Sequence, residues 1–533
     1  MQMTSAAQAL SSNRKIQYKK VLYVFLILLS ATVPLLVCSK SSPLYPFNDW
    51  TDVNMYFTLG KGLVCGRIPY VELAEQKGPY LFVVSGIGYL FSHKSFHGYF
   101  LFEVLSMFLL LWYSHRILLL YTKRPCLWLL PLLSTGVAAA KSFVHGGSLE
   151  ELTLGLFAYG LFSLLRFLKS EKQDGMRTGT LIANGLLAGI LLWSKFSLLG
   201  FYIVWVLVMM AVYVSGKRFR ELFRSVGIFI LAMAATTLPW LIYFGYHDAV
   251  GVWLKAYLWD NIFGYAAGGD SPLVNRLGIA LLNGFRSLKD PENLTYGLSV
   301  LLGGAAYLAL PESLVARREK VSVSCLGIGM TLGIFIGGTK HDYYGLPLAV
   351  FGVLGLLALA FLAEGLRKLY RKKREEIGKR EGLMEAAAAG ATLLILAVGT
   401  LNAYRVSPNT YLLGMKREEL PQFRFAEQIE QADDTSVLNY GFLDGGFYTV
   451  LDQIPSVMYY CTLNVNYDEI LEVQNGYVEQ ELTNFLVTWK AYTAQEEELN
   501  NLPVVSEHYE LLDYVYFPYE GAYRTYALYR LRQ

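Results

Sequence analysis

Long apolar runs, separated by short loops that alternate in charge, constrain this chain more than any other feature. The runs reach about 17 residues or more, which is enough for a helix to cross the hydrocarbon core of a bilayer. They explain why 54% of the 533 residues are hydrophobic and only 17% are charged. In soluble domains, about a quarter of the residues are charged. The sequence therefore predicts a polytopic α-helical membrane protein.

The first apolar run, residues 21–38, has a basic flank on its N-terminal side. Arg14, Lys15, Lys19 and Lys20 precede the run, and no small-residue cleavage site follows it. Because basic residues stay on the cytoplasmic side of a membrane, the run is predicted to be a retained signal-anchor. The N-terminus is then expected in the cytosol.

The positive-inside rule predicts how the remaining runs cross the membrane. Strongly basic loops such as 217–224 and 367–380 fall on one side, whereas acidic and aromatic loops fall on the other. The apolar stretch 79–92 is short, so it is predicted to lie on the membrane surface or to re-enter from it. About eleven spans are expected, at 21–38, 97–121, 126–143, 152–168, 178–193, 197–215, 225–243, 294–311, 321–338, 345–364 and 384–402.

After Asn402 the composition changes from apolar to charged and turn-rich. Alternating β-rich runs and helical patterns in this part predict a small α/β domain outside the cytoplasm. The expected organisation is a transmembrane domain, 1–402, with a first external loop at 39–96, followed by an extracytoplasmic domain, 403–533. The β-rich runs lie at 436–440, 456–460, 485–489, 514–517 and 523–531, and the helical patterns at 419–431 and 467–482.

Bulk charge and cysteine content narrow the class of protein further. The net charge of +3 is too small to argue for a nucleic-acid partner. The five cysteines are scattered without a CxxC pair, and no spacing typical of metal ligands stands out, so no metal site is expected. Short loops without organelle signals indicate a multi-pass protein of a prokaryotic plasma membrane.

An acidic and aromatic sequence follows the first span directly. Asp52 begins a helical-looking segment in which Asp52, Tyr56 and Gly60 share one helix face. A carboxylate held at a membrane surface can act as a general base on a lipid-linked substrate. Asp52, or Asp49 before it, can equally stabilise a helix start through the helix dipole. Spacing alone leaves both interpretations open.

Other polar residues fall at the predicted external ends of spans, and each has a functional and a structural interpretation. Lys77 can hold a phosphate or extend to the interface as a snorkelling lysine. Glu150 can serve a site or compensate a helix dipole, and Lys195 can neutralise an anion or mark the interface. His341 and Tyr343 can line a site, or serve as a hydrogen-bonding residue and part of an aromatic belt. Their convergence on one side favours a common site.

The first external loop resembles that of the GT-C glycosyltransferases, in the branch that contains the protein O-mannosyltransferases and the lipid A aminoarabinose transferase. The resemblance covers roughly residues 20–360. It implies a GT-C-like membrane fold and an inverting transfer of a sugar from a polyprenyl-phosphate carrier to an extracytoplasmic hydroxyl. It is carried by Asp52-x-x-x-Tyr56, Gly66-x-x-Pro69-Tyr70 and Lys77-Gly78-Pro79, with support from Glu150 and His341-x-Tyr343-Tyr344.

The resemblance also implies a role for individual residues. Asp52 is expected to be the base on the acceptor hydroxyl, with Asp49 as the alternative. Lys77 matches the lysine that holds the carrier phosphate. Glu150 matches a second acidic position of the family.

The late part of the chain and one departure complete this picture. The resemblance implies that His341 and Tyr343 line the donor pocket. Lys195, from its position between two spans, is expected to bind the donor phosphate. Gln76 stands where some relatives carry a glutamate implicated in metal binding. This departure argues against a bound divalent metal here.

The expected partners are a polyprenyl-phosphate sugar, membrane lipids and an acceptor that is a cell-wall polymer, a glycolipid or a protein hydroxyl. A phosphate-linked sugar already has a charged leaving group, so the reaction needs a base and cations rather than an acid. The alternative function is a transporter or lipid flippase without transferase activity. Transporters tend to show internal repeats and broken mid-membrane spans, and the sequence shows no repeat.

Overall fold

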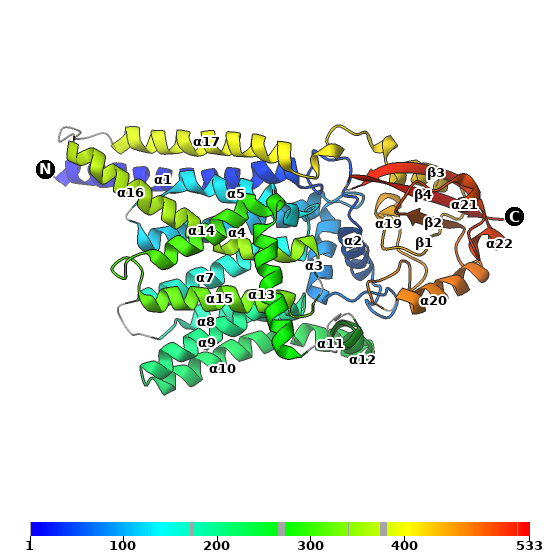
Figure 1. Ribbon diagram of the computed structural model, residues 1–533, viewed down its shortest axis with the longest axis horizontal. Coiled ribbons are helices and arrows are strands. Elements are labelled where there is room, and N and C mark those ends of the chain that lie inside the picture. The colour runs from blue at the N-terminus through cyan, green and yellow to red at the C-terminus, as the bar shows by residue number, and fades with distance from the viewer. Residues whose placement is uncertain are drawn as a thin grey trace.

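The computed structural model has a long helical bundle at one end and a small sheet domain at the other (Figure 1). The N-terminus lies at the free end of the bundle, and the C-terminus lies at the far side of the sheet (Figure 1). The predicted fold class, a helical membrane protein with a C-terminal α/β domain, is confirmed, whereas the boundary at 402/403 stays a prediction. The structure describes residues 2–122, 124–170, 175–264, 272–338, 340–373, 381–465, 467–519 and 521–532.

The bundle consists of helices whose apolar side chains pack into one large core. The final part of the basic loop predicted at 367–380, residues 374–380, lies outside the described residues. In chain order the bundle helices are α1 (Gln2–Cys38), α4 (His97–Tyr121), α5 (Leu130–Ala138), α6 (Leu149–Leu152), α7 (Leu154–Lys169), α8 (Thr178–Leu192), α9 (Gly200–Ser215), α10 (Phe219–Ala235), α11 (Leu238–Tyr246), α13 (Leu273–Lys289), α14 (Leu294–Ala309), α15 (Arg317–Phe335), α16 (Val353–Lys373) and α17 (Glu381–Val406).

Short 3-10 and π segments connect several of these helices. A π-helical segment, η4 (Lys255–Gly264), follows the short helix α12 (Val250–Leu254). The 3-10 segments of the bundle are η1 (Leu127–Leu129), η2 (Lys141–Phe143), η3 (Phe196–Leu199), η5 (Pro291–Asn293) and η6 (Asp342–Gly352).

Within the described residues, 7 helical stretches are long and apolar enough to cross a membrane. The predicted spans 126–143 and 178–193 correspond instead to the shorter apolar helices Leu127–Ala138 and Thr178–Leu192. The predicted number of spans therefore remains a prediction. The long stretches are Gln17–Cys38, His97–Tyr121, Leu149–Lys169, Phe196–Ser215, Phe219–Tyr246, Asp342–Leu366 and Ala386–Val406.

The predicted span 225–243 is interrupted. Helix α10 ends at Ala235, and α11 begins at Leu238 with Pro239 in its first turn. Proline suits the start of a helix, where its missing N–H costs no hydrogen bond, but it ends the helix before it. The apolar run is therefore continuous in sequence and broken in backbone.

The segment 244–293, which lies between the predicted spans 225–243 and 294–311, contains α12, η4 and α13. Helix α13 packs against α14 and α15 and crosses the direction of the bundle helices in Figure 1. Residues 273–289 thus form a helix for which the sequence pattern gave no prediction.

Helices α2 (Thr51–Val64) and α3 (Pro79–Phe91) lie between the bundle and the C-terminal domain (Figure 1). They pack closely because glycines face each other at the contact. A Cβ placed on Gly60 would lie 2.4 Å from the backbone nitrogen of Gly86. The short apolar stretch predicted at 79–92 is thus a short helix packed on the helix that carries Asp52.

The C-terminal domain contains a sheet of order β1-β2-β4-β3. Strand β1 pairs with β2 in parallel, whereas the other neighbours are antiparallel. Its helical segments and strands are η7 (Thr410–Leu412), η8 (Arg417–Glu419), α18 (Pro421–Ile429), β1 (Val437–Asn439), α19 (Phe447–Leu451), α20 (Tyr467–Glu479), β2 (Phe485–Lys490), α21 (Glu496–Asn500), α22 (Val505–His508), β3 (Tyr509–Tyr519) and β4 (Ala522–Leu531).

The strand predicted at 456–460 is absent, and these residues form bends and turns. The segment still runs beside β1, because the backbone N–H of Asn439 donates to the carbonyl of Tyr460 at 3.2 Å. The carbonyl of Tyr459 instead accepts from the side-chain amide of Gln474 at 2.9 Å. A hydrogen bond from a side chain thus takes the place of a backbone hydrogen bond of the strand that the alternating sequence pattern predicted.

The first loop, 39–96, and the C-terminal domain share one hydrophobic core. Phe47 packs against Phe423 with ring centroids 5.8 Å apart. Polar contacts reinforce this interface, because Thr58 donates to Asp444 at 2.7 Å and Lys61 donates to the carbonyl of Tyr448 at 2.8 Å. The C-terminal domain therefore holds helix α2 from the side opposite the bundle.

Candidate active site

Helix α2 places the carboxylate of Asp52 in its first turn, with a residue exposure of 6%. The hydroxyl of Tyr56, one turn further along α2, donates to Asp52 Oδ2 at 3.2 Å. The hydroxyl of Tyr343, from the distant segment η6, donates to the same oxygen, also at 3.2 Å. A carboxylate that only stabilises the start of a helix needs no hydrogen bond from either phenol. The two hydrogen bonds therefore indicate that the carboxylate of Asp52 is held in a fixed orientation.

A second charged group lies beside Tyr343. Lys195 forms an ion pair with Glu150, which is buried at the start of α6. The Lys195 ammonium also lies 3.9 Å from the ring centroid of Tyr344 and 5.4 Å from that of Tyr343. Aromatic faces attract cations. The structure thus joins three segments that are far apart in sequence.

His341 precedes η6 and stacks on Tyr343, with ring centroids 5.6 Å apart and an interplanar angle of 16°. Burial lowers the pKa of His341, which keeps its imidazole neutral near pH 7. The charges of Asp52, Lys195, Lys77 and Glu150 all act on this ring. The residues predicted to share a site therefore lie around one histidine.

Lys77 is half-buried on an ordered segment that leads into α3. The carbonyl of Lys77 accepts from the hydroxyl of Tyr70 at 2.5 Å. The next residue, Gly78, packs so closely that an added Cβ would lie 2.1 Å from the carbonyl oxygen of Trp193. This contact fixes Lys77 next to the end of α8, from which Lys195 follows.

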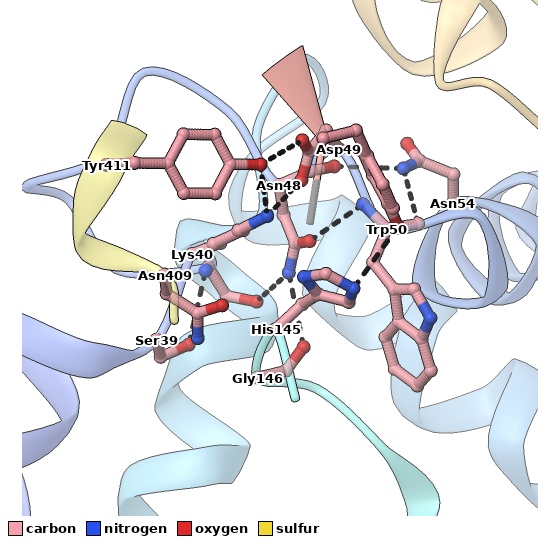
Figure 2. Close-up of polar contacts among 12 residues, drawn as sticks. Ser39, Lys40, Asn48, Asp49, Trp50, Asn54, His145, Gly146, Asn409 and Tyr411 are labelled. Atoms are coloured by element: carbon pink, nitrogen blue, oxygen red, sulfur yellow. Dashed lines mark hydrogen bonds and ion pairs between the residues drawn. The ribbon is translucent and has the colours of Figure 1, made fainter. Parts of the chain in front are cut away.

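Asp49, the alternative base, has different surroundings (Figure 2). Its Oδ1 pairs with Lys40 Nζ at 2.6 Å, and its Oδ2 accepts from the hydroxyl of Tyr411 at 3.1 Å. Burial opposes ionisation, but Lys40, His145 and Tyr411 outweigh it and lower the pKa of Asp49. Both carboxylate oxygens therefore serve a buried link between the first loop and η7.

Glu75 is a site residue that sequence reasoning missed. It is 2% exposed, and its Oε1 accepts from the backbone N–H groups of Gln76 at 2.6 Å and Lys77 at 3.1 Å. Burial raises the pKa of Glu75 to about 6, with Lys77 opposing the shift and Asp52 adding to it. Its position in the sequence, directly before Gln76 and Lys77, is the signal from which Glu75 could have been predicted.

Some relatives are expected to carry a metal-binding glutamate at the position of Gln76. No group of three or more His, Cys, Asp or Glu side chains in the described part of the chain comes together in a way that could hold an ion.

The sequence matches no protein-family model, and it matches no curated protein. The fold, however, is similar to that of ArnT from Cupriavidus metallidurans, which was solved bound to undecaprenyl phosphate. The TM-score is 0.60 at 12% identity, and the match covers 94% of this chain and 97% of that chain. The apo state of the same ArnT gives a TM-score of 0.60 at 12% identity, over 96% and 98% of the two chains.

This similarity extends over the bundle, the first loop and the C-terminal domain, because almost the whole of both chains is covered. At 12% identity it concerns the arrangement of the backbone and not individual residues. The chain therefore has an ArnT-like fold, which agrees with the fold expected from the resemblance of its first loop.

Proposed function

We propose that this chain is an inverting glycosyltransferase that moves a sugar from a polyprenyl-phosphate donor to a hydroxyl of an extracytoplasmic acceptor. The observation that carries the proposal is the contact of Asp52 with Tyr343, beside the Lys195–Glu150 ion pair. A carboxylate at the hydroxyl and a cation over the ring thus meet at one tyrosine. This is the arrangement that a base and a departing phosphate require.

The proposed step is a single displacement at the anomeric carbon. Asp52 takes the proton of the acceptor hydroxyl as its oxygen attacks, and the bond from the anomeric carbon to the phosphate oxygen breaks. Polyprenyl phosphate leaves with the electron pair, and attack from the opposite face inverts the configuration. Tyr56 and Tyr343 hold Asp52 in position, while Lys77 and Lys195 stabilise the charge on the leaving group.

The same proposal covers the partners and the location of the chain. The ArnT structure holds undecaprenyl phosphate, which supports a polyprenyl-phosphate lipid as the donor carrier here. The donor tail stays in the lipid of a prokaryotic plasma membrane, and its head group meets the site from the extracytoplasmic side. The N-terminus is cytosolic, the C-terminal domain is extracytoplasmic, and no metal takes part.

The test is the release of free polyprenyl phosphate by purified protein from a panel of labelled polyprenyl-phosphate sugars. Asp52→Asn should lower the rate by about 10²–10⁴, the usual contribution of general-base catalysis, without changing thermal unfolding in detergent. Asp433→Asn, at an exposed position of the C-terminal domain, is the matched control. A chelator should leave the rate unchanged.

Two outcomes would contradict the proposal. Full activity of the Asp52→Asn variant would remove Asp52 from the mechanism. Movement of intact donor across vesicle membranes, without cleavage of any donor in the panel, would instead support the transporter or flippase alternative.

A further inference from the structure

A cavity of about 340 Å³ lies between the first loop, the segment before and within η4, and the C-terminal domain. This volume falls within the range of about 300–1,000 Å³ found for ligand sites. Glu75 and Gln76 line one wall, Ala256 lines the second, and Tyr459 and Ile470 line the third. We call it the Glu75 cavity.

Two residues of this wall each carry a buried oxygen that lacks a hydrogen-bond partner among the described residues. The two oxygens are Oε2 of Glu75 and Oε1 of Gln76, and both residues are 2% exposed. A buried oxygen that accepts no hydrogen bond costs about 1–3 kcal/mol, so such atoms in a native fold need an explanation. A ligand that donates hydrogen bonds from the cavity supplies one.

The charges around the cavity favour the same class of ligand. Glu75, Asp260 and Glu469 line it, and Lys255 is its cation. Lys255 already pairs with Asp260 at 3.0 Å. The lining therefore carries more carboxylates than cations, which disfavours an anionic ligand and favours a neutral or cationic group.

Apolar and aromatic side chains complete the walls. Met458, Ile470 and Val473 come from the C-terminal domain, and Tyr70 comes from the first loop. Sugars combine hydroxyl donors at their edges with C–H groups on their faces. A carbohydrate group thus matches both the orphan oxygens and the apolar walls.

Glu75 connects the cavity to the proposed base. Its carboxylate lines the cavity, and it interacts electrostatically with both Asp52 and Lys77. A general base must contact the hydroxyl that it deprotonates. Asp52 is outside the cavity lining, so the hydroxyl that reacts must extend past Glu75 to reach it.

We propose that the Glu75 cavity binds the acceptor substrate, and that its reacting end is a hydroxyl-bearing carbohydrate group without phosphate or carboxylate. This inference rests on the proposed function. The C-terminal domain then selects the acceptor, since its residues form one wall of the cavity.

The first experiment measures binding of simple probes to the full-length protein in detergent, by saturation-transfer NMR. The probes are methyl α-D-glucopyranoside, D-glucosamine, D-glucuronate and α-D-glucose 1-phosphate. The neutral and cationic probes should bind, and the two anions should bind at least about tenfold more weakly. Equal or stronger binding of the anions would overturn the proposed chemistry.

Variants that fill the cavity test whether the probes bind inside it. Ile470→Trp on α20 should weaken binding of methyl α-D-glucopyranoside by at least about tenfold, and Ala256→Trp repeats the test from the opposite wall. Glu472→Trp, exposed on the same helix and outside the cavity lining, is the control. Unchanged binding in both filled variants, with thermal unfolding retained, would overturn the inference.

The final arm separates the acceptor from the donor. This arm uses a donor that the wild-type protein cleaves. The filled variants should transfer its sugar to methyl α-D-glucopyranoside at least about tenfold more slowly, while they keep the slow hydrolysis that releases polyprenyl phosphate. Equal loss of both would place the donor sugar in the cavity and overturn the assignment. If wild-type protein cleaves no donor while the probes still bind, the proposed function fails and the carbohydrate cavity stands.

Discussion

Asp49 and Asp52 are neighbours in sequence, yet the structure surrounds them differently. Asp49 pairs with a lysine, whereas Asp52 accepts only from the phenols of Tyr56 and Tyr343 among the hydrogen bonds of the described residues. A carboxylate in a tight ion pair is a poor base because its charge is already compensated. One aspartate therefore supports the fold, and the other can accept a proton.

Asp49→Asn should destabilise the protein by about 3–5 kcal/mol, because Lys40 stays buried without a counter-charge. Thermal unfolding in detergent measures this loss. The double variant Lys40→Met/Asp49→Leu should recover most of it, since replacing both partners removes the buried charge.

The pKa of Asp49 is lowered, so the stability that it contributes is present above its unfolded pKa and is lost as the pH falls through the folded pKa. Wild-type stability in the single variant would contradict this role.

Glu75 predicts the opposite dependence on pH. Burial raises its pKa from 4.5 to about 6, so ionisation of Glu75 opposes folding as the pH rises through this window. Glu75→Gln should therefore raise the unfolding free energy by about 2 kcal/mol above pH 6 and by nothing below pH 4.5. Unfolding of both proteins across pH 4–8 checks this, and a gain confined to low pH would refute it.

At the scale of elements, the contact of α2 with α3 determines where the candidate base points. Gly60 faces Gly86 at this contact, and α2 carries Asp52 two turns before Gly60. Small residues allow two helix backbones to approach closely. A larger side chain must push α2 toward the C-terminal domain.

Gly60→Ala should lower stability by about 1–3 kcal/mol, as overpacking of a tight contact does. It should also slow donor cleavage, because Asp52 moves with α2. Gly227→Ala is the matched control, since an added Cβ there meets nothing within 4 Å, and alanine favours a helix by about 0.5–1 kcal/mol. Melting temperature and donor cleavage are the measurements, and equal behaviour of the two variants would contradict the prediction.

At the scale of the whole molecule, the sheet domain and the bundle lie at opposite ends (Figure 1). Helix α17 runs along α1 and leads into the C-terminal domain. The predicted topology places the basic loop that begins α15 on the cytosolic side and α20 on the extracytoplasmic side. Labelling of intact cells distinguishes these two sides.

The exposed cysteines Cys65 and Cys325 are first replaced by serine. In that background, a membrane-impermeant maleimide should label Glu479→Cys on α20 in intact cells. It should label Arg318→Cys only after the membrane is permeabilised. Both positions are exposed, so accessibility of the side chain is matched, and the reverse pattern would overturn the proposed orientation.

The sequence by itself determined the class of protein and most of the residues gathered at the site. Apolar runs predict membrane helices because the bilayer core cannot satisfy polar groups, which is a local property of each run. The pattern around Asp52, Tyr56 and Lys77 is also local, so the first loop could be interpreted without the fold. Local patterns predicted the backbone less well where turns determine its path, as for the absent strand at 456–460 and the helix break before Pro239.

Only the tertiary structure decided which of these residues meet. The hydroxyl of Tyr343 reaches Asp52 across 291 positions of sequence, and Lys195 meets Glu150 across 45. The ion pair of Asp49 and the cavity beside Glu75 likewise depend on how the C-terminal domain packs on the first loop. Such contacts arise from many weak interactions between distant segments, and no periodicity within one segment records them.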